Sequence, residues 1–203
     1  MIITYLGHAC FSLESEGYRI LTDPYREIPF PPLAAEAHEV FCSHGHFDHA
    51  ATETVTLLPA AASPFTVTEI PCYHDEVQGA KRGENTIRVF EAEGIRVAHL
   101  GDLGHLLREE QLAALGEIDV LLIPVGGVYT LDPAEAKQTA DAIDARIVVP
   151  MHYRRGNLGL SNIADVEDFL RLYSRERVQY APFAAFDPAD YGWVTVLLPT
   201  FGA

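Results

Sequence analysis

The chain has 203 residues, of which 14 are Lys or Arg and 29 are Asp or Glu, so its formal net charge is −15 with histidine neutral. This balance disfavours nucleic acid as a partner, because affinity for a polyanion depends on basic side chains that replace condensed counterions. A hydrophobic content of 48% and a charged content of 21% are ordinary for a globular protein and exclude disordered and fibrous classes. The length predicts one domain over residues 1 to 203 with a sizeable core.

The sequence carries no membrane or disulfide signal. No apolar run approaches the roughly 20 residues that a membrane-spanning helix needs, and the first residues lack the basic segment of a secretory signal. We therefore expect a cytoplasmic protein with no membrane partner. Cys10, Cys42 and Cys72 form no C-x-x-C pair, which argues against a disulfide framework and a cysteine zinc cage. The sequence leaves the oligomeric state open, a homo-oligomer included.

Short runs of apolar and β-prone residues in the first half of the chain predict strands. Residues 2 to 6, 10 to 14 and 18 to 22 are separated by short turns and predict an antiparallel meander. A proline-rich loop from Pro24 to about Leu33 follows. The later predicted strands are residues 40 to 42, residues 65 to 70, and a hairpin of residues 86 to 91 and 95 to 99.

The second half alternates helical and strand patterns. Helices are predicted at residues 103 to 115, 133 to 143 and 163 to 172, and strands at residues 120 to 123, 146 to 149 and 193 to 198. The helix that begins at Pro133 has a clear start, because Asp132 can cap it and Glu135 completes a capping box. Alternation over residues 95 to 150 predicts parallel strands joined by right-handed crossovers, and therefore an α/β fold.

Histidine and aspartate side chains near strand ends are candidate metal ligands. Four lie within six residues directly after a strand and three follow later strands: His44, His46, Asp48, His49, His74, Asp102 and His152. Because parallel strands end at one edge of a sheet, we expect Asp102 and His152 to be neighbours. Residues i and i+2 of an extended segment project to one side, so His44 and His46 can bind one ion, which His74 completes. Asp48 and His49 then turn toward a second ion, which His152 completes. We expect Asp102 to bridge both ions, with open positions that are typical of a catalytic centre.

At these positions the chain resembles the metallo-β-lactamase-fold hydrolases. The segment His44-x-His46-x-Asp48-His49, followed in order by His74, Asp102 and His152, matches the metal motifs of that superfamily, and Asp23 matches the aspartate of its first motif. Leu6-Gly-His-Ala9 and Pro150-Met-His152 resemble segments of the branch that contains ascorbate-phosphate lactonases. The resemblance implies a four-layer α/β/β/α sandwich with the site at one edge of the paired sheets.

Departures from the superfamily pattern narrow the expected substrate. The di-iron oxygen-reducing branch carries Glu where this chain has His46, so that chemistry is not expected. The nuclease branch adds an inserted domain or an RNA-binding arm, for which this chain has no spare residues. Glyoxalase-type enzymes append a helical domain, whereas 51 residues follow His152 here. We therefore expect a small-molecule substrate.

Other residues are expected around the metal ligands. We expect Asp23 to hold a metal-binding loop by hydrogen bonds, and His99, which precedes Asp102 on the same strand, to be a buried hydrogen-bonded histidine rather than a ligand. Cys42 and Cys72 lie two positions before His44 and His74, but small buried residues are ordinary at apolar strand ends, so we do not expect them to bind metal.

Two groups of residues are candidates for contact with the substrate. The candidates to protonate the leaving group are His8, Tyr129 and His105, and the sequence does not choose between them. The basic residues expected near the site edge are Lys81, Arg82 and Arg154, which together suggest an anionic group on the substrate.

The sequence therefore predicts a hydrolase with two divalent metal ions and a bridging hydroxide that attacks a small lactone, ester or amide, with Asp48 orienting the hydroxide. Zinc is the first expectation, and manganese or iron are the alternatives for a set of His and Asp ligands without thiolate. Two other functions stay open. One is phosphodiester cleavage of a small nucleotide, and the other is a non-catalytic sensor or scaffold that keeps its metal for ligand binding or stability.

Overall fold

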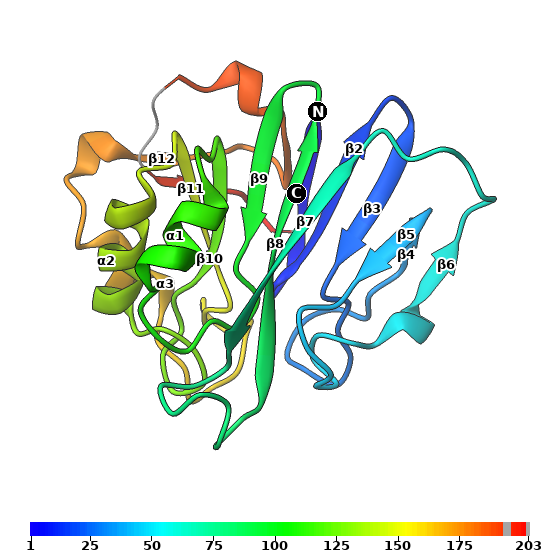
Figure 1. Cartoon of the computed structure of the whole chain (residues 1–203). Coiled ribbons are helices and arrows are strands. Elements are labelled where there is room, and N and C mark those ends of the chain that lie inside the picture. Colours follow the sequence, from blue (N-terminus) through cyan, green and yellow to red (C-terminus); the bar gives the residue numbers. More distant parts are fainter. Residues whose placement is uncertain (193–195, 202–203) are drawn as a thin grey trace.

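Two five-stranded sheets lie face to face at the centre of the molecule (Figure 1). The computed structural model describes residues 1–192 and 196–201. In hydrogen-bonded order, the first sheet contains β13 (Ala185–Phe186), β1 (Ile2–Gly7), β2 (Cys10–Ser15), β3 (Tyr18–Thr22) and β5 (Glu39–Phe41). The second sheet contains β11 (Ile147–Met151), β10 (Val120–Pro124), β9 (Ile95–His99), β8 (Glu84–Ala92) and β7 (Thr66–Tyr73).

The first sheet begins with the antiparallel meander that the sequence predicts. Its side chains alternate between two faces, so Phe11 belongs to the large apolar core and its neighbour Cys10 points to the other side. On that other side Cys10 packs in a smaller apolar cluster with Tyr25 of the proline-rich loop and with the parallel strands β4 (Ala35–Ala37) and β6 (Val55–Leu57). The first sheet is therefore covered on both faces.

The second sheet combines parallel and antiparallel pairs. Strands β9, β10 and β11 are parallel, and β7, β8 and β9 are antiparallel, as the predicted crossovers and hairpin require. Every residue of β10 and β11 is buried. A continuous apolar run is typical of a parallel strand that is covered on both faces, which confirms the predicted buried strands.

The α-helices lie on the outer face of the second sheet (Figure 1). They are α1 (Glu109–Leu115), α2 (Pro133–Ile143) and α3 (Val166–Leu170). The start of α2 is the predicted capping box, because Asp132 accepts a hydrogen bond from the Glu135 amide at 2.8 Å and Glu135 accepts one from the Asp132 amide at 3.1 Å. The opposite side is covered by the proline-rich loop and the β4–β6 pair. The predicted four-layer sandwich is therefore confirmed, but among the described residues these segments replace the α-helices expected over the first sheet.

The predicted helix over residues 103 to 115 is wrong in its first half, because α1 begins only at Glu109. The residues that precede α1 are hydrogen-bonded to the end of β7, where the Gly104 amide donates to the Tyr73 carbonyl at 3.1 Å. A Cβ at Gly104 would lie 2.5 Å from the backbone of His74, so the chain passes too close to β7 to form a helical turn.

Other element boundaries also differ from the predictions. Strand β7 continues to Tyr73, because an edge strand tolerates Pro71 and β8 pairs with it along its whole length. The third helix is shorter than predicted, with the Asp165 side chain capping α3 at the Glu167 amide. Of the predicted last strand, residues 193–195 lie outside the described residues, and β14 (Val196–Leu198) pairs with the unpredicted β12 (Val178–Tyr180). The described residues also form short 3₁₀ helices at Thr52–Thr54, Arg175–Arg177 and Pro188–Asp190.

Strand ends from both sheets converge at one edge of the sandwich. The segments that follow β3, β5, β7, β9 and β11 carry the predicted aspartate and histidine residues, and the turn between β1 and β2 lies against the end of β11, where the His152 amide donates to the His8 carbonyl at 2.9 Å. Among the described residues, no helix is long and apolar enough to cross a membrane.

Candidate metal centre

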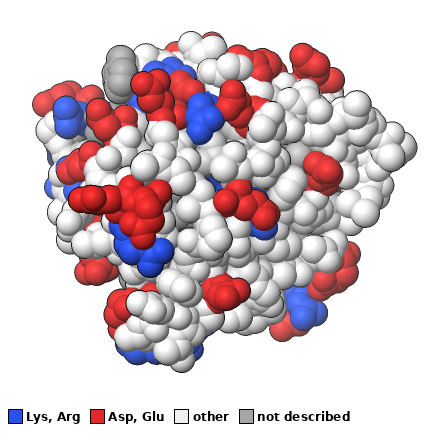
Figure 2. Space-filling view, in the orientation of Figure 1, with Lys and Arg blue, Asp and Glu red and all other residues white. Residues whose placement is uncertain are grey.

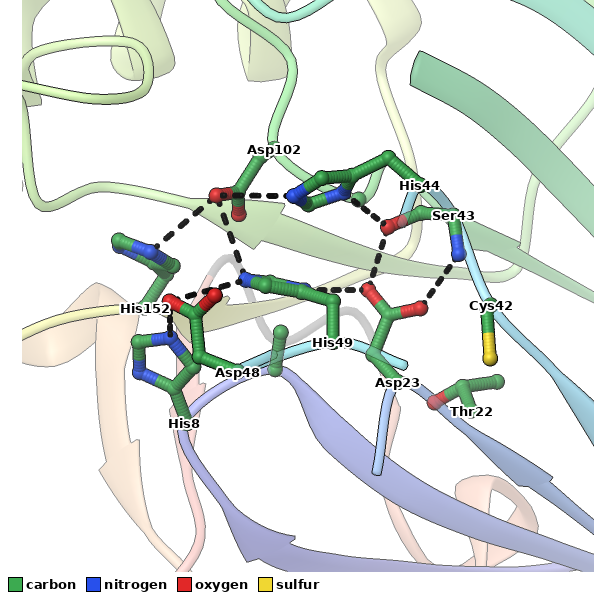
Figure 3. A network of polar contacts seen from close by, with 12 residues as sticks. His8, Thr22, Asp23, Cys42, Ser43, His44, Asp48, His49, Asp102 and His152 are labelled. Carbon is green, nitrogen blue, oxygen red and sulfur yellow. Dashed lines mark hydrogen bonds and ion pairs between the residues drawn. The ribbon is translucent and has the colours of Figure 1, made fainter. Parts of the chain in front are cut away.

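The predicted metal ligands lie close together at this edge, and Figure 3 labels five of them together with His8. One group contains His44, His46 and His74, another contains Asp48, His49, His152 and, in addition, His8, and a third set, His44, His49 and Asp102, joins these two groups. Within each group the atoms that can bind a metal all lie within 4.8 Å of one another. The division into two groups is the one expected from the spacing of the motif, and His8 is an addition from the turn between β1 and β2.

Asp102 lies between the two groups. Its Oδ2 atom is 3.2 Å from Nε2 of His74 and 3.9 Å from Nε2 of His44 in the first group. The same oxygen is 3.2 Å from Nε2 of His49 and 3.3 Å from Nε2 of His152 in the second. One carboxylate oxygen that contacts ligands of both groups has the geometry of a shared ligand.

Several buried polar atoms of the cluster lack a hydrogen-bond partner in the part of the chain that the structure describes. They are Nε2 of His44, Nε2 of His49, Oδ1 of Asp102, and both ring nitrogens of His8 and His152. Buried polar atoms are nearly always paired, so a convergent set of unpaired ones indicates a missing ligand. Imidazole nitrogen and carboxylate oxygen are the donors that Zn²⁺, Mn²⁺ and Fe²⁺ accept, and the residues therefore fit divalent cations.

Hydrogen bonds orient three of the histidines so that Nε2 faces the cluster. Nδ1 of His74 donates to the Tyr129 carbonyl at 3.0 Å, and Nδ1 of His44 lies 3.0 Å from the Ser43 hydroxyl. Nδ1 of His49 lies 2.8 Å from Oδ2 of Asp23. A partner on one ring nitrogen sets the tautomer and leaves the other nitrogen for a metal.

Asp23 is the buried centre of these supporting contacts, as the sequence predicts for it (Figure 3). It accepts hydrogen bonds from the amide and the hydroxyl of Ser43, both at 2.6 Å, besides its contact with His49. Burial disfavours the charge of Asp23, but the nearby His99 and His49 and these hydrogen bonds outweigh it and hold the pKa of the Asp23 carboxyl at about 2. The charged carboxylate therefore stays available to His49.

Without a metal ion, the imidazole rings of His49 and His44 differ in charge because their surroundings differ. Burial works against a charge on His49, but Asp102 and Asp23 on either side raise the pKa of this imidazole well above its usual value. Burial lowers the pKa of His44 to about 3, and the nearby His49 adds to that effect. The cluster without metal therefore holds a proton on His49 while His44 stays neutral.

Sequence reasoning missed two residues that position the ligands, Ser43 and Asn85. Asn85 is buried, its Oδ1 accepts a hydrogen bond from the Asp102 amide at 3.0 Å, and its Nδ2 donates to the Leu100 carbonyl at 2.9 Å. A Cβ at Gly101, whose φ is +55°, would lie 2.4 Å from Oδ1 of Asn85, so this position requires glycine. The available signal was a polar residue at the start of β8 in alternation with the apolar Ile87 and Val89, on the buried face of the strand.

His99 is buried but does not belong to either metal-binding group. Its Nε2 donates to the Ala9 carbonyl at 2.8 Å, and its Nδ1 accepts from the Gly101 amide at 3.1 Å. These contacts are those of the hydrogen-bonded histidine that the sequence favours. His99 connects the end of β9 to the turn between β1 and β2.

A cavity of about 560 Å³ opens beside the cluster. It is lined by metal-binding candidates and by apolar and basic residues: Gly45, His46, Phe47, Asp48, His74, Arg82, Asp102, Tyr129, His152 and Leu160. The guanidinium of Arg82 donates to the Val128 carbonyl at 2.7 Å and lies 5.7 Å from the centre of the Tyr129 ring. The Tyr129 hydroxyl accepts a hydrogen bond from Asn162 at 2.8 Å.

The structure does not bring every predicted substrate contact to this cavity. Lys81 pairs with Glu76 in an exposed loop, and Arg154 lies 3.5 Å from Asp165. Neither basic residue lines the cavity, so of the three predicted ones only Arg82 lies there.

His105 is also outside the cavity lining. Its Nε2 accepts from the Tyr73 amide at 3.3 Å and its Nδ1 donates to the Leu106 carbonyl at 2.8 Å. With both ring nitrogens bonded to backbone, His105 has no proton to offer a substrate.

Comparison with known proteins agrees with this geometry. The sequence profile of the β-lactamase superfamily domain matches residues 2–152, which include all the candidate ligands. The chain belongs to the β-lactamase superfamily. The chain is 30% identical over 207 residues to a UPF0173 protein of Pyrococcus furiosus, and the match covers 88% of this chain and 93% of the relative. It is 34% identical over 186 residues to a UPF0173 metal-dependent hydrolase of Methanoculleus marisnigri, with 75% and 81% covered.

A solved structure also matches this β-lactamase superfamily member over nearly its whole length. It is the crystal structure of a candidate Zn-dependent hydrolase of the metallo-β-lactamase superfamily from Thermotoga maritima, with a TM-score of 0.77 and 37% identity. The match covers 98% of this chain and 97% of that one. The metallo-β-lactamase fold predicted from the sequence is thereby confirmed, whereas the likeness to the lactonase branch stays a prediction.

Proposed function

We propose that this metal-dependent hydrolase works with a binuclear centre. One ion would be held by His44, His46 and His74, and the other by Asp48, His49 and His152, with Asp102 shared. The observation that carries the proposal is the position of the Asp102 carboxylate, whose Oδ2 lies 3.2 to 3.9 Å from histidine nitrogens of both groups. We propose zinc as the metal, with manganese or iron as the alternatives that the same donors accept.

Two divalent ions, when bound, would supply Lewis acidity and a hydroxide nucleophile near neutral pH. Asp48 would orient the attacking water, because it lines the cavity and its Oδ2 lies between Nε2 of His8 at 3.3 Å and Nε2 of His49 at 3.8 Å. Burial disfavours the charge on Asp48, but the nearby His8 and His49 rings hold the pKa of this carboxyl well below its usual value. Asp48 is therefore a carboxylate that can accept a hydrogen bond from the water.

Of the three candidates to protonate the leaving group, we propose Tyr129. His105 bonds to backbone away from the cavity, and His8 is fully buried and does not line it. Tyr129 lines the cavity, and its hydroxyl oxygen accepts from Asn162, which leaves its O–H free to donate to a departing oxygen or nitrogen.

We propose that the substrate is a small lactone, ester or amide that carries a carboxylate or phosphate. The cavity volume of about 560 Å³ falls within the roughly 300–1,000 Å³ typical of small-molecule sites. Acidic side chains are scattered over the face shown in Figure 2, and the chain has 29 of them, so the single basic side chain in the cavity lining, Arg82, can locally attract an anion. Phe47 and Leu160 would contact an apolar part of the same molecule.

The test is turnover by the chain reconstituted with zinc or manganese, across lactones, esters, thioesters, amides and phosphodiesters. We expect hydrolysis of a carboxylate- or phosphate-bearing lactone, ester or amide that is lost with a chelator, regained with metal, and much reduced in the Asp102→Asn variant. Turnover of small nucleotide phosphodiesters alone would overturn the proposed substrate class. No turnover of any compound by a chain that carries two ions would overturn the proposed chemistry.

A further inference from the structure

His8 lies at the tip of the turn between β1 and β2, in an uncommon backbone conformation with a φ of 55°. Such a left-handed conformation is strained for a non-glycine residue and persists only where the surroundings hold it. Here the His152 amide donates to the His8 carbonyl at 2.9 Å. A Cβ at the preceding Gly7, whose φ is +113°, would lie 2.8 Å from the Phe30 ring. The turn is thus held against the end of β11.

The ring of His8 is fully buried, and neither of its nitrogens has a hydrogen-bond partner among residues 1–192 and 196–201. A buried imidazole without any partner is costly, because each desolvated polar atom loses its bond to water. In the proposed reaction this ring lies near Asp48 but neither contacts the substrate nor transfers a proton to it. The two unpaired ring nitrogens of His8 therefore indicate a binding partner that is not a protein group.

The residues around the His8 ring indicate that this binding partner is a metal ion. The centre of the His8 ring lies 4.1 Å from that of His152 and 5.1 Å from that of His49, and its Nε2 is 3.3 Å from Oδ2 of Asp48 (Figure 3). The atoms of these four residues that can bind a metal lie within 4.8 Å of one another. They come from both sheets and converge on one point.

We propose that His8 is an additional protein ligand of the second metal position, beside Asp48, His49 and His152. This inference rests on the binuclear centre proposed above and makes its two positions unequal. His8 does not line the cavity, so it would bind the second ion from the interior of the protein. Candidate ligands of both positions line the cavity, Asp48 and His152 as well as His46 and His74, but the first position has one protein ligand fewer and therefore more room for a substrate oxygen.

The direct test is nuclear magnetic resonance of the chain labelled with ¹⁵N-histidine and loaded with two equivalents of ¹¹³Cd²⁺. A ring nitrogen bonded to the ion shows a one-bond coupling to cadmium, which neither a hydrogen bond nor proximity produces. We expect this coupling at one ring nitrogen of His8. Within the same spectrum His49 is the positive control, and His99, which is buried but bonded to the Ala9 carbonyl, is the negative control.

The outcomes separate this inference from the function on which it rests. Coupling at His49 and at the other ligands but not at His8 overturns the inference and leaves the binuclear centre intact. Coupling at no histidine overturns the centre itself. The His8 signals are assigned by their loss in His8→Asn, and by triple-resonance experiments on the unmodified chain if that variant does not fold.

Metal titration of the same variant gives a second readout. Asparagine tolerates the left-handed conformation but is too short to reach the ion. We expect His8→Asn to weaken one of the two bound ions by more than about 100-fold, since loss of a residue that only supports a ligand costs about 10- to 100-fold. The other ion should change by only a few fold. The control is His38→Asn, whose ring stacks on Tyr18 away from the cluster, and unchanged affinity for both ions in His8→Asn would overturn the inference.

Discussion

Nδ1 of His49 lies 2.8 Å from the Asp23 carboxylate, and Nε2 of the same ring lies 3.2 Å from the carboxylate of Asp102. One imidazole thus connects a loop of the first sheet with a loop of the second, between two buried negative charges. In the metal-free chain these charges favour a proton on the ring, and a cation that binds Nε2 replaces that proton. The contact with Asp23 uses Nδ1 and leaves Nε2 available, so we expect it to support metal binding.

The first prediction concerns Asp23. Asp23→Asn keeps a hydrogen-bond acceptor but removes the charge that supports His49 and holds Ser43. We expect the affinity for metal to fall about 10- to 100-fold, as measured by competition with a chelator. The matched control is Asp168→Asn, an exposed carboxylate paired with Arg171, which should bind metal as the unmodified chain does. Equal losses in the two variants would show that overall charge, and not this contact, is responsible.

The second prediction concerns stoichiometry. The unmodified chain should bind two divalent ions, counted by elemental analysis after metal loading and desalting. Asp102→Asn removes a charge shared by both ions and should weaken both, whereas His74→Ala should weaken mainly the ion held with His44 and His46. A single ion in the unmodified chain, or the same pattern of loss in both variants, contradicts the assignment of ligands to positions.

The third prediction compares two neighbouring basic residues. Arg82 lines the cavity and Lys81 pairs with Glu76 outside it. With an anionic substrate, Arg82→Gln should raise KM by roughly tenfold, the equivalent of about 1.4 kcal/mol of binding, and should flatten the dependence of kcat/KM on salt. Lys81→Gln removes the same charge one residue away and should change KM little. If Arg82→Gln leaves KM unchanged, the anionic substrate is the wrong expectation.

The fourth prediction is the pH dependence of the metal-free chain. Burial lowers the pKa of His8 to about 4 and of His44 to about 3, whereas the same rings in the unfolded chain take up protons near 6.5. Between about pH 6.5 and 4 the unfolded state therefore binds more protons, and the free energy of unfolding should fall as the pH falls, by up to about 1.4 kcal/mol per pH unit for each ring. The raised pKa of His49 has the opposite effect on stability. Its contribution to the free energy of unfolding is present below pH 6.5 and is lost as the pH rises from 6.5 through the raised pKa.

Urea unfolding of chelator-treated protein at several pH values from 7 to 5 checks this, because the carboxyl groups titrate below that range. The variant His44→Gln should show a shallower slope than the unmodified chain. A free energy of unfolding that rises as the pH falls from 6.5 would contradict the burial of neutral rings.

The elements that the sequence predicts correctly are those governed by neighbouring residues. The buried strands β10 and β11 follow from continuous apolar runs, and the start of α2 follows from Asp132, Pro133 and Glu135, which interact within one helical turn. The predicted helix over residues 103 to 115 fails because Gly104 packs against the backbone of His74, a contact between segments 30 residues apart that no local pattern encodes.

The sequence by itself identified the candidate metal ligands. The four candidates from His44 to His49 are adjacent in the chain, and Asp102 and His152 follow parallel strands whose ends necessarily meet at one sheet edge. The direction in which successive side chains point predicted that His44 and His46 would lie together, and the structure places them in one candidate group.

Only the tertiary structure decided which other side chains reach the site. Asp75 accepts hydrogen bonds from the amides of Val77, Gly79, Lys81 and Arg82. In the loop that folds around Asp75, the Lys81 side chain contacts Glu76, whereas the Arg82 side chain contacts the Val128 carbonyl beside the cavity. His8 likewise joins the cluster through a left-handed turn held by the end of β11. The turn around Asp75 is local, but the bond from Arg82 to the Val128 carbonyl and the bond from the His152 amide to the His8 carbonyl join segments far apart in the sequence, and these form only when the chain has folded.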